Sequence, residues 1–134
     1  MGIGFGHNMQ ALLITRGLRE MIHISKAVGA EVNAFLGTAG IGDLIATAIS
    51  SNSRNYTFGM HLANGKTVAE IGEIMDEIAE GYRTIRFAHK IVTAADLNAP
   101  IIKTLYNVVY EEKPIKKALI ELIYNPLTED VDFI

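Results

Sequence analysis

The sequence has 134 residues, with 12 Lys and Arg against 15 Asp and Glu, so its formal charge is −3. We expect a chain of this length to form one domain, and its 49% apolar and 20% charged residues exclude a disordered polymer. The mild acidity, with a pI near 5.8, argues against a general affinity for nucleic acid. The absence of cysteine excludes disulfides and thiolate metal sites, and it fits the reducing cytoplasm, where we expect the protein.

Hydropathy bears on membranes and on the surface. No apolar run approaches the roughly 20 residues that span a bilayer, and residues 1–6 lack the basic start of a secretory signal. The mean hydropathy of +0.23 is nevertheless high for a domain with five Phe, five Tyr and no Trp. We therefore expect apolar surface that this chain cannot cover alone.

The first predicted helix extends from Ala11 to Val28, where apolar residues recur at intervals of three and four. Asn8 is a suitable N-cap, and Gly29 stands where a left-handed residue ends a helix. The broad apolar stripe indicates a central helix packed on more than one side. A short apolar helix, Val32 to Leu36, follows. The stripe consists of Leu12, Leu13, Leu18, Met21, Ile22, Ile24 and Val28.

Three glycines lie in the segment 37–43, GTAGIGD, which is predicted as a glycine-rich loop because glycine allows positive φ and close backbone approach. Asp43 then opens a helix through Ile49, as an acid favoured by the helix dipole. Residues 50–53, SSNS, form a polar break with strong capping chemistry. A further helix is predicted from about residue 55 to residue 63.

Two more helix starts follow in the middle of the chain. Thr67 and Glu70 match a capping box, which starts a helix that fades near Gly72. Residues 80–84, EGYRT, lead into a helix with one apolar face. That face is predicted to contain Phe87, Ala88, Ile91, Val92 and Ala95.

The last two helices are predicted from their prolines. Pro100 and Pro114 suit the first helical position, and Pro126 ends the final helix before an acidic tail at 127–134. Alternation of period two is absent, so strands have little support. We predict a single all-α domain of six to eight helices. The residues expected to be buried in the final helix are Ala118, Leu119, Leu122 and Ile123.

Several common catalytic and metal motifs are absent from the sequence. The four histidines are scattered and show no metal-ligand spacing, so we expect no metal site. There is no Gly-x-Ser-x-Gly elbow and no Walker A motif. The histidines are His7, His23, His61 and His89.

One group of polar residues could bind a small polyhydroxylated anion. Asp43 and Thr47 are four residues apart and so share a helix face, and Ser53-Arg54-Asn55 follows at the next helix start. Arg54 offers a planar cationic fork for a phosphate, and unbonded amides at a helix start add donors. Asp43 and Asn55 can hold hydroxyl groups with directed hydrogen bonds.

A purely structural interpretation of these residues stays open. Asp43 and Ser53 can be N-caps, and Arg54 can pair with a surface carboxylate. Glu80, in the segment 80–84, can likewise be the acidic first turn of a helix.

At these residues the sequence resembles bacterial NAD(P)-dependent glycerol-3-phosphate dehydrogenases. Four motifs occur in the order seen in that family, and the match extends over nearly the whole chain. They are ALLITRGL at 11–18, GIGDL at 40–44, SRN at 53–55 with FG at 58–59, and EGYRT at 80–84. The segments NVVYE at 107–111 and PL at 126–127 also look like the end of that family.

The resemblance implies reversible hydride transfer between sn-glycerol 3-phosphate and dihydroxyacetone phosphate, with NAD or NADP as cofactor. This reaction supplies a precursor of glycerophospholipids. The resemblance also implies a helical fold like the C-terminal domains of 6-phosphogluconate dehydrogenase-like enzymes. Residues matching the family's substrate pocket are Asp43, Thr47, Ser53, Arg54 and Asn55, and those matching its cofactor contacts are Arg54, Ile78 and Glu80.

The resemblance is confined to the family's C-terminal substrate-binding domain, which corresponds to residues 1–134. Nothing here matches the strand, glycine-rich turn and helix that begin a dinucleotide-binding domain. The family's catalytic lysine, its general acid/base, is expected upstream of Met1. We therefore expect that the chain alone does not turn over and does not bind the cofactor tightly.

Two further expectations concern partners. Apolar surface that the nucleotide domain covers in the family predicts that this chain forms a homodimer or associates with itself. An alternative function is a non-catalytic helical module that serves association. A dehydrogenase acting on a hydroxy acid is disfavoured by the motifs at 53–55 and 80–84.

Overall fold

The protein is represented by a computed structural model that describes residues 4–76 and 80–124. Within these residues the chain forms eight α-helices and one π-helix and no strand, which confirms the all-α prediction. The elements are α1 (His7–Ala27), α2 (Asn33–Leu36), the π-helix η1 (Thr38–Gly42), α3 (Asp43–Ile49), α4 (Arg54–Ala63), α5 (Val68–Ile74), α6 (Glu80–Ala94), α7 (Pro100–Tyr110) and α8 (Ile115–Tyr124).

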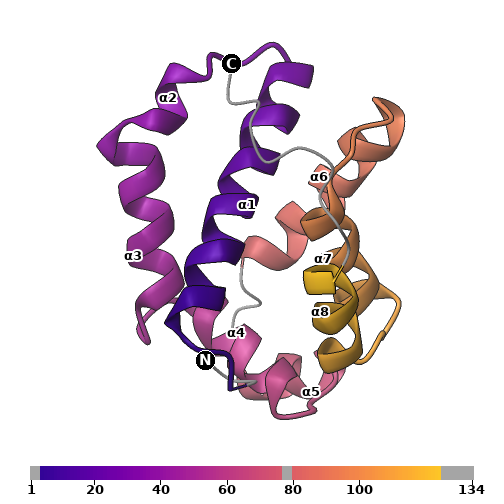
Figure 1. The fold of residues 1–134 in the computed structure, drawn as a ribbon. Coiled ribbons are helices and arrows are strands. Elements are labelled where there is room, and N and C mark those ends of the chain that lie inside the picture. The colour runs from indigo at the N-terminus through magenta and orange to yellow at the C-terminus, as the bar shows by residue number, and fades with distance from the viewer. Residues whose placement is uncertain (1–3, 77–79, 125–134) are drawn as a thin grey trace.

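Helix α1 stands in the centre of the domain (Figure 1). α3 packs against one side of it, and α6 and α7 pack against the other. α8 packs on α7 and also contacts α4, while α4 and α5 lie at the base of the view. The prediction of a central helix packed on more than one side is therefore confirmed.

The two ends of α1 differ in how well the sequence predicted them. The N-cap is Gly6, whose carbonyl oxygen accepts hydrogen bonds from the amides of Met9 and Gln10 at 3.1 and 3.2 Å. Asn8 lies inside the first turn, so its prediction as the N-cap was wrong. At the other end Gly29 has a φ of +78°, as predicted for the residue that ends the helix.

The glycine-rich segment is helical, whereas the sequence predicted a loop. Residues 38–42 form η1, and Gly42 has φ −60° and ψ −49°, so this helix continues directly into α3. Asp43 therefore follows a helical turn and does not open a helix after a loop. The predicted close approach is confirmed at Gly40, where a Cβ would lie 2.4 Å from the carbonyl oxygen of Phe35. Glycine serves here by its small size and not by a positive φ.

The capping box of α5 forms as predicted. The Thr67 hydroxyl accepts a hydrogen bond from the Glu70 amide at 3.2 Å, and the Glu70 carboxylate accepts one from the Thr67 amide at 2.7 Å. These hydrogen bonds hold the pKa of Glu70 below its usual value. The helix continues past Gly72 and ends at Ile74.

The apolar faces of α6 and α8 are narrower than predicted. Ala88 and Val92 are buried in α6, as are Ala118 and Leu122 in α8. Phe87 is 68% exposed, so its place on the buried face was wrong. Because successive helical residues point about 100° apart, Phe87 points in a different direction from its buried neighbour Ala88.

The prolines mark the last helices, with one small shift. Pro100 is the first residue of α7, as predicted. α8 begins at Ile115, one residue after the position predicted from Pro114. The predicted end at Pro126 and the acidic tail at 127–134 lie outside the described residues.

A buried carboxylate ties α1 to the start of α7. Glu20 is only 6% exposed, and its Oε1 and Oε2 atoms accept hydrogen bonds from the amides of Ile101 and Ile102 at 2.6 and 3.0 Å. These two amides lie in the first turn of α7, where no helical carbonyl reaches them. Ala99, just before the helix, is 1% exposed, so water has little access to this end.

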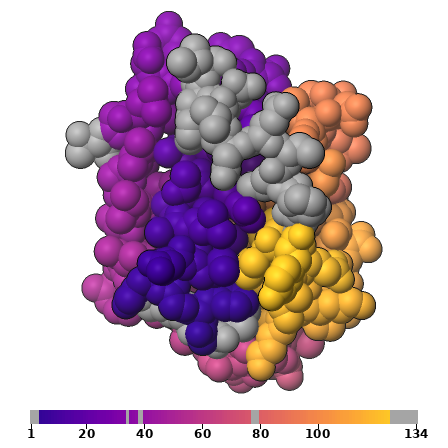
Figure 2. Space-filling view, viewed as in Figure 1, coloured from indigo at the N-terminus to yellow at the C-terminus, as the bar shows by residue number. Residues whose placement is uncertain are grey.

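The core is small, and much apolar surface is exposed. Phe58, Ile71 and Val109 form its buried cluster. The first part of α1 reaches the surface between α3 and α8 (Figure 2). Large apolar side chains are exposed on several helices, as the mean hydropathy predicted. In the described part of the chain no helix is both long and apolar enough to cross a bilayer. The exposed large apolar residues are Val28, Leu36, Ile45, Ile49, Ile74, Phe87, Leu105, Ile120 and Tyr124.

Candidate functional site

The two predicted site residues of α3 lie on its exposed face. Asp43 is the first residue of α3 and Thr47 lies one turn later, so their side chains share a side of the helix. α3 and α4 are in contact across the intervening turn. Among the described residues, however, no hydrogen bond joins either side chain to Asn55.

The start of α4 combines a capping residue with two candidate ligand-binding residues. The Ser53 hydroxyl accepts a hydrogen bond from the Tyr56 amide at 3.4 Å, so the structural interpretation of Ser53 as an N-cap is confirmed. Arg54 and Asn55 are the first two residues of the helix, and both are exposed. The cap thus fixes where the guanidinium and the carboxamide leave the backbone.

Asn55 joins the start of α4 to the start of α6. Its Oδ1 atom accepts a hydrogen bond from the Gly81 amide at 3.2 Å, between residues 26 apart in sequence. A Cβ on Gly81 would lie 2.6 Å from that oxygen, so no larger residue fits there without moving Asn55. Glu80, next to Gly81, is exposed in the first turn of α6. The motifs at 53–55 and 80–84 therefore form one junction, which we call the α4–α6 junction.

The motifs at 53–55 and 80–84 were predicted as separate features, and the hydrogen bond between Gly81 and Asn55 was not predicted. The only available signal was Gly81, since glycine inside a helix start can mark close approach of another group. The role of Asn55 also changes. One of its oxygen lone pairs is used by Gly81, so the amide group Nδ2 becomes the part best suited to meet a ligand.

A small hollow lies beside the junction. It has a volume of about 220 Å³ and is bounded by α1, α3, α4 and α8, with Asn55, Tyr56, Gly59, Ala48 and Leu13 among its walls. Arg54 is not part of this wall. The structure thus brings Asn55 to a hollow, and a pocket shared by Asp43, Arg54 and Asn55 stays a prediction. Ile78 lies outside the described residues.

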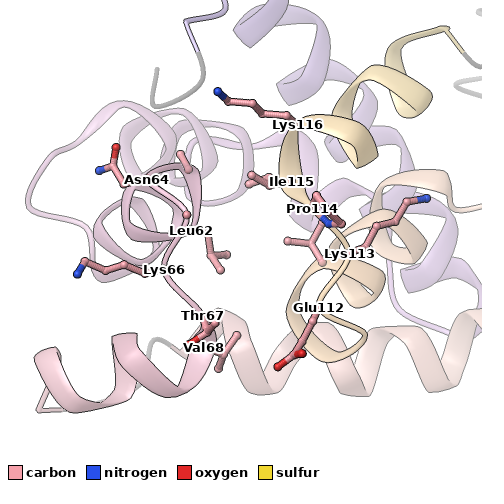
Figure 3. Close-up of a pocket in the computed structure, with 13 residues that line it drawn as sticks. Leu62, Asn64, Lys66, Thr67, Val68, Glu112, Lys113, Pro114, Ile115 and Lys116 are labelled. Carbon is pink, nitrogen blue, oxygen red and sulfur yellow. The ribbon is translucent and has the colours of Figure 1, made fainter.

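A larger hollow, of about 590 Å³, lies elsewhere (Figure 3). It is bounded by the end of α4, the start of α5 and the turn from α7 to α8, with Leu62, Val68 and Ile115 on its walls. None of the predicted site residues lines it. In the described part of the chain no three His, Asp or Glu side chains gather as metal ligands.

Comparison with known proteins matches the chain to one family. Residues 1–120 match the family model described as NAD-dependent glycerol-3-phosphate dehydrogenase C-terminus. The chain is 40% identical over 130 residues to glycerol-3-phosphate dehydrogenase [NAD(P)+] of Leuconostoc mesenteroides, covering 97% of this chain and 39% of that protein. It is 43% identical over 122 residues to the protein of the same name from Geobacter metallireducens, covering 91% and 36%.

A solved structure shows the same fold. The crystal structure of glycerol-3-phosphate dehydrogenase from Coxiella burnetii superimposes with a TM-score of 0.86 and 29% sequence identity, covering 92% of this chain and 38% of that one. The chain thus spans between 36% and 39% of the length of these relatives. By the match over residues 1–120, the chain belongs to the family of C-terminal domains of NAD-dependent glycerol-3-phosphate dehydrogenases.

Proposed function

We propose that this chain is the substrate-binding part of an NAD(P)-dependent glycerol-3-phosphate dehydrogenase. The reaction is hydride transfer between sn-glycerol 3-phosphate and dihydroxyacetone phosphate. The observation that supports it best is the hydrogen bond from the Gly81 amide to Asn55, because it joins two motifs that the family resemblance assigns to one site.

Each candidate residue has a role that suits its chemistry. The Arg54 guanidinium binds the phosphate through paired hydrogen bonds. Nδ2 of Asn55 donates to a substrate oxygen, while Asp43 and Thr47 orient hydroxyl groups from α3. Ser53 contributes mainly by capping α4.

The cofactor contacts are proposed on the same junction. Glu80 presents an exposed carboxylate, which suits ribose hydroxyls, and Arg54 presents a cation for a phosphate at the neighbouring helix start. When bound, NAD or NADP accepts or supplies the hydride. Ile78 is proposed as a packing contact of the same cofactor. In this proposal the chain's own residues bind and orient the three-carbon phosphate.

The surface and the composition support proposals about association and location. The exposed apolar residues, with Ile45 and Ile49 one turn apart on α3, favour a homodimer or another form of self-association. The lack of cysteine favours the cytoplasm. The same apolar residues favour the alternative function, a helical association module.

Calorimetric titration of the chain with glycerol 3-phosphate tests the proposal. We expect weak saturable binding that is lost in Arg54→Ala and kept in Lys117→Ala, which removes an exposed positive charge from α8. Inorganic phosphate should bind more weakly than glycerol 3-phosphate because it lacks the hydroxyl contacts. Equal loss in both variants, or no heat of binding at millimolar ligand, would favour the association module instead.

A further inference from the structure

Tyr110, the last residue of α7, contacts the backbone of α6 next to the α4–α6 junction. It belongs to the segment 107–111, which the resemblance includes and the proposed site does not use. Its hydroxyl donates a hydrogen bond to the carbonyl oxygen of Tyr82 at 2.7 Å. Tyr82 directly follows Gly81, whose amide is bonded to Asn55. The contact between α7 and α6 therefore lies one residue away from the junction.

Stacked rings hold α6 and α7 together around this hydrogen bond. The centroid of the Tyr110 ring lies 4.8 Å from that of Tyr82 and 5.1 Å from that of Tyr106. Tyr106 stacks in turn on His89 at 3.8 Å with an interplanar angle of 10°. Since Tyr82 and His89 lie about two turns apart on α6, the stack fixes the position of α6 along α7.

The hydroxyl of Tyr110 is well suited to act as a permanent donor. Partial burial raises its pKa, and the neighbouring Tyr82 raises it further. A phenol keeps its proton at neutral pH even at its ordinary pKa of about 10, and this shift acts in the same direction. The Tyr82 carbonyl has two lone pairs, so it can accept this hydrogen bond in addition to one within the helix.

We propose that Tyr110 is a positioning residue of the candidate site. Through Tyr82 it holds the first turn of α6, and with it the Gly81 amide that fixes Asn55. Its effect on substrate binding rests on the proposed function, whereas its effect on the Gly81 amide does not. Tyr110 acts through these groups and is not a catalytic residue.

Hydrogen exchange of the Gly81 amide in the intact chain tests the positioning role. Tyr110→Phe keeps the ring and removes the donor, and Tyr106→Phe removes a hydroxyl from the same stack as a matched control. We expect exchange of the Gly81 amide to become about three- to tenfold faster in Tyr110→Phe, from the loss of one hydrogen bond, and to change less than about twofold in Tyr106→Phe. Equal rates in the two variants, at similar thermal midpoints, would overturn the proposal.

Two further measurements separate positioning from general destabilisation. The side-chain amide resonances of Asn55 should shift in Tyr110→Phe and stay in place in Tyr106→Phe. The Kd for glycerol 3-phosphate should rise by about threefold in Tyr110→Phe alone. An equal rise in both variants would overturn the role in binding. Should the unaltered chain not bind glycerol 3-phosphate, the proposed function fails, and the exchange of the Gly81 amide still decides the role of Tyr110.

Discussion

The α4–α6 junction and the exposed face of α3 hold the two halves of the candidate site in different ways. At the junction, Asn55 is bonded to a backbone amide from a distant helix, and a Cβ on Gly81 would lie 2.6 Å from the Asn55 oxygen. On α3, Asp43 and Thr47 are exposed, and among the described residues no hydrogen bond ties them to Asn55. A hydrogen bond within the chain thus holds the junction in place, whereas a shared ligand between the α3 residues and the junction is part of the proposal.

The largest expected effect on activity comes from the cation at the junction. Arg54→Ala should cost about 3 kcal/mol in transition-state binding when this chain replaces the matching 39% of the Leuconostoc mesenteroides relative, because a charge-assisted contact to phosphate is lost. Steady-state kinetics would show it as a fall in kcat/KM. Arg54→Lys should recover little, since a point charge does not reproduce the fork. Activity close to that of the unaltered fusion in Arg54→Ala would remove Arg54 from the site.

Substitution of Glu20 tests whether its buried carboxylate anchors α7, the helix that packs against α6. Glu20→Ala leaves two amides at the buried start of α7 without acceptors, so we expect the free energy of unfolding to fall by about 2–4 kcal/mol. Glu31→Ala, at an exposed position, serves as the control. Urea unfolding of both variants measures the difference, and equal stability of the two would show that the buried carboxylate does not anchor α7.

The pH dependence of the same group has a definite sign. Burial raises the pKa of Glu20, although hydrogen bonds from the Ile101 and Ile102 amides and the charge of Lys103 oppose it. A carboxyl group whose pKa is raised in the folded state contributes its full stabilisation below its pKa in the unfolded state. This contribution is lost as the pH rises through its pKa in the folded state. The stability of the chain relative to Glu20→Gln should therefore fall as the pH rises from the ordinary pKa of a glutamate towards neutrality. A relative stability that rises with pH would contradict this cause.

Gly81→Ala tests the closeness of the junction. A Cβ there must displace the Asn55 oxygen, so we expect a loss of about 1–2 kcal/mol in the free energy of unfolding together with weaker binding of glycerol 3-phosphate. Gly72→Ala is the matched control, because nothing lies within 4 Å of a Cβ at that helical position. Alanine should stabilise α5 there by up to about 1 kcal/mol. Similar effects of the two substitutions would show that Asn55 moves aside freely.

The smallest effect is expected on α3. Asp43→Ala and Thr47→Ala should change the free energy of unfolding by no more than about 0.5 kcal/mol, because both side chains are exposed. They should nevertheless weaken the binding of glycerol 3-phosphate and leave exchange of the Gly81 amide unchanged. Faster exchange at Gly81 in either variant would mean that the two regions are coupled without a ligand.

Local sequence patterns predicted most helix boundaries but not the conformation of the glycine-rich segment. The capping box of Thr67 and Glu70, Pro100 and Gly29 act within one turn of the chain, so their residue types suffice. The segment 37–43 was predicted as a loop because glycine content alone does not distinguish positive φ from tight packing. The structure uses Gly40 for packing against the Phe35 backbone.

The candidate site shows the same limit. Spacing placed Asp43 beside Thr47 and put Arg54 and Asn55 at a helix start, and the structure confirms these placements. The bond from Gly81 to Asn55 spans 26 residues, and that from Tyr110 to Tyr82 spans 28. Periodicity within one helix carries no information on such pairs. Glu20 escaped prediction for the same reason, since its partners are more than 80 residues away.

An NMR titration of the isotope-labelled chain with glycerol 3-phosphate tests most directly whether the starts of α4 and α6 bind the same ligand. We expect three NMR signals to shift together and to saturate with a single Kd. They are the backbone amides of Arg54 and Gly81 and the side-chain amide of Asn55. Movement confined to residues around the larger hollow, such as Lys66 and Lys116, with the Gly81 and Asn55 signals unmoved, would contradict a substrate site at the α4–α6 junction.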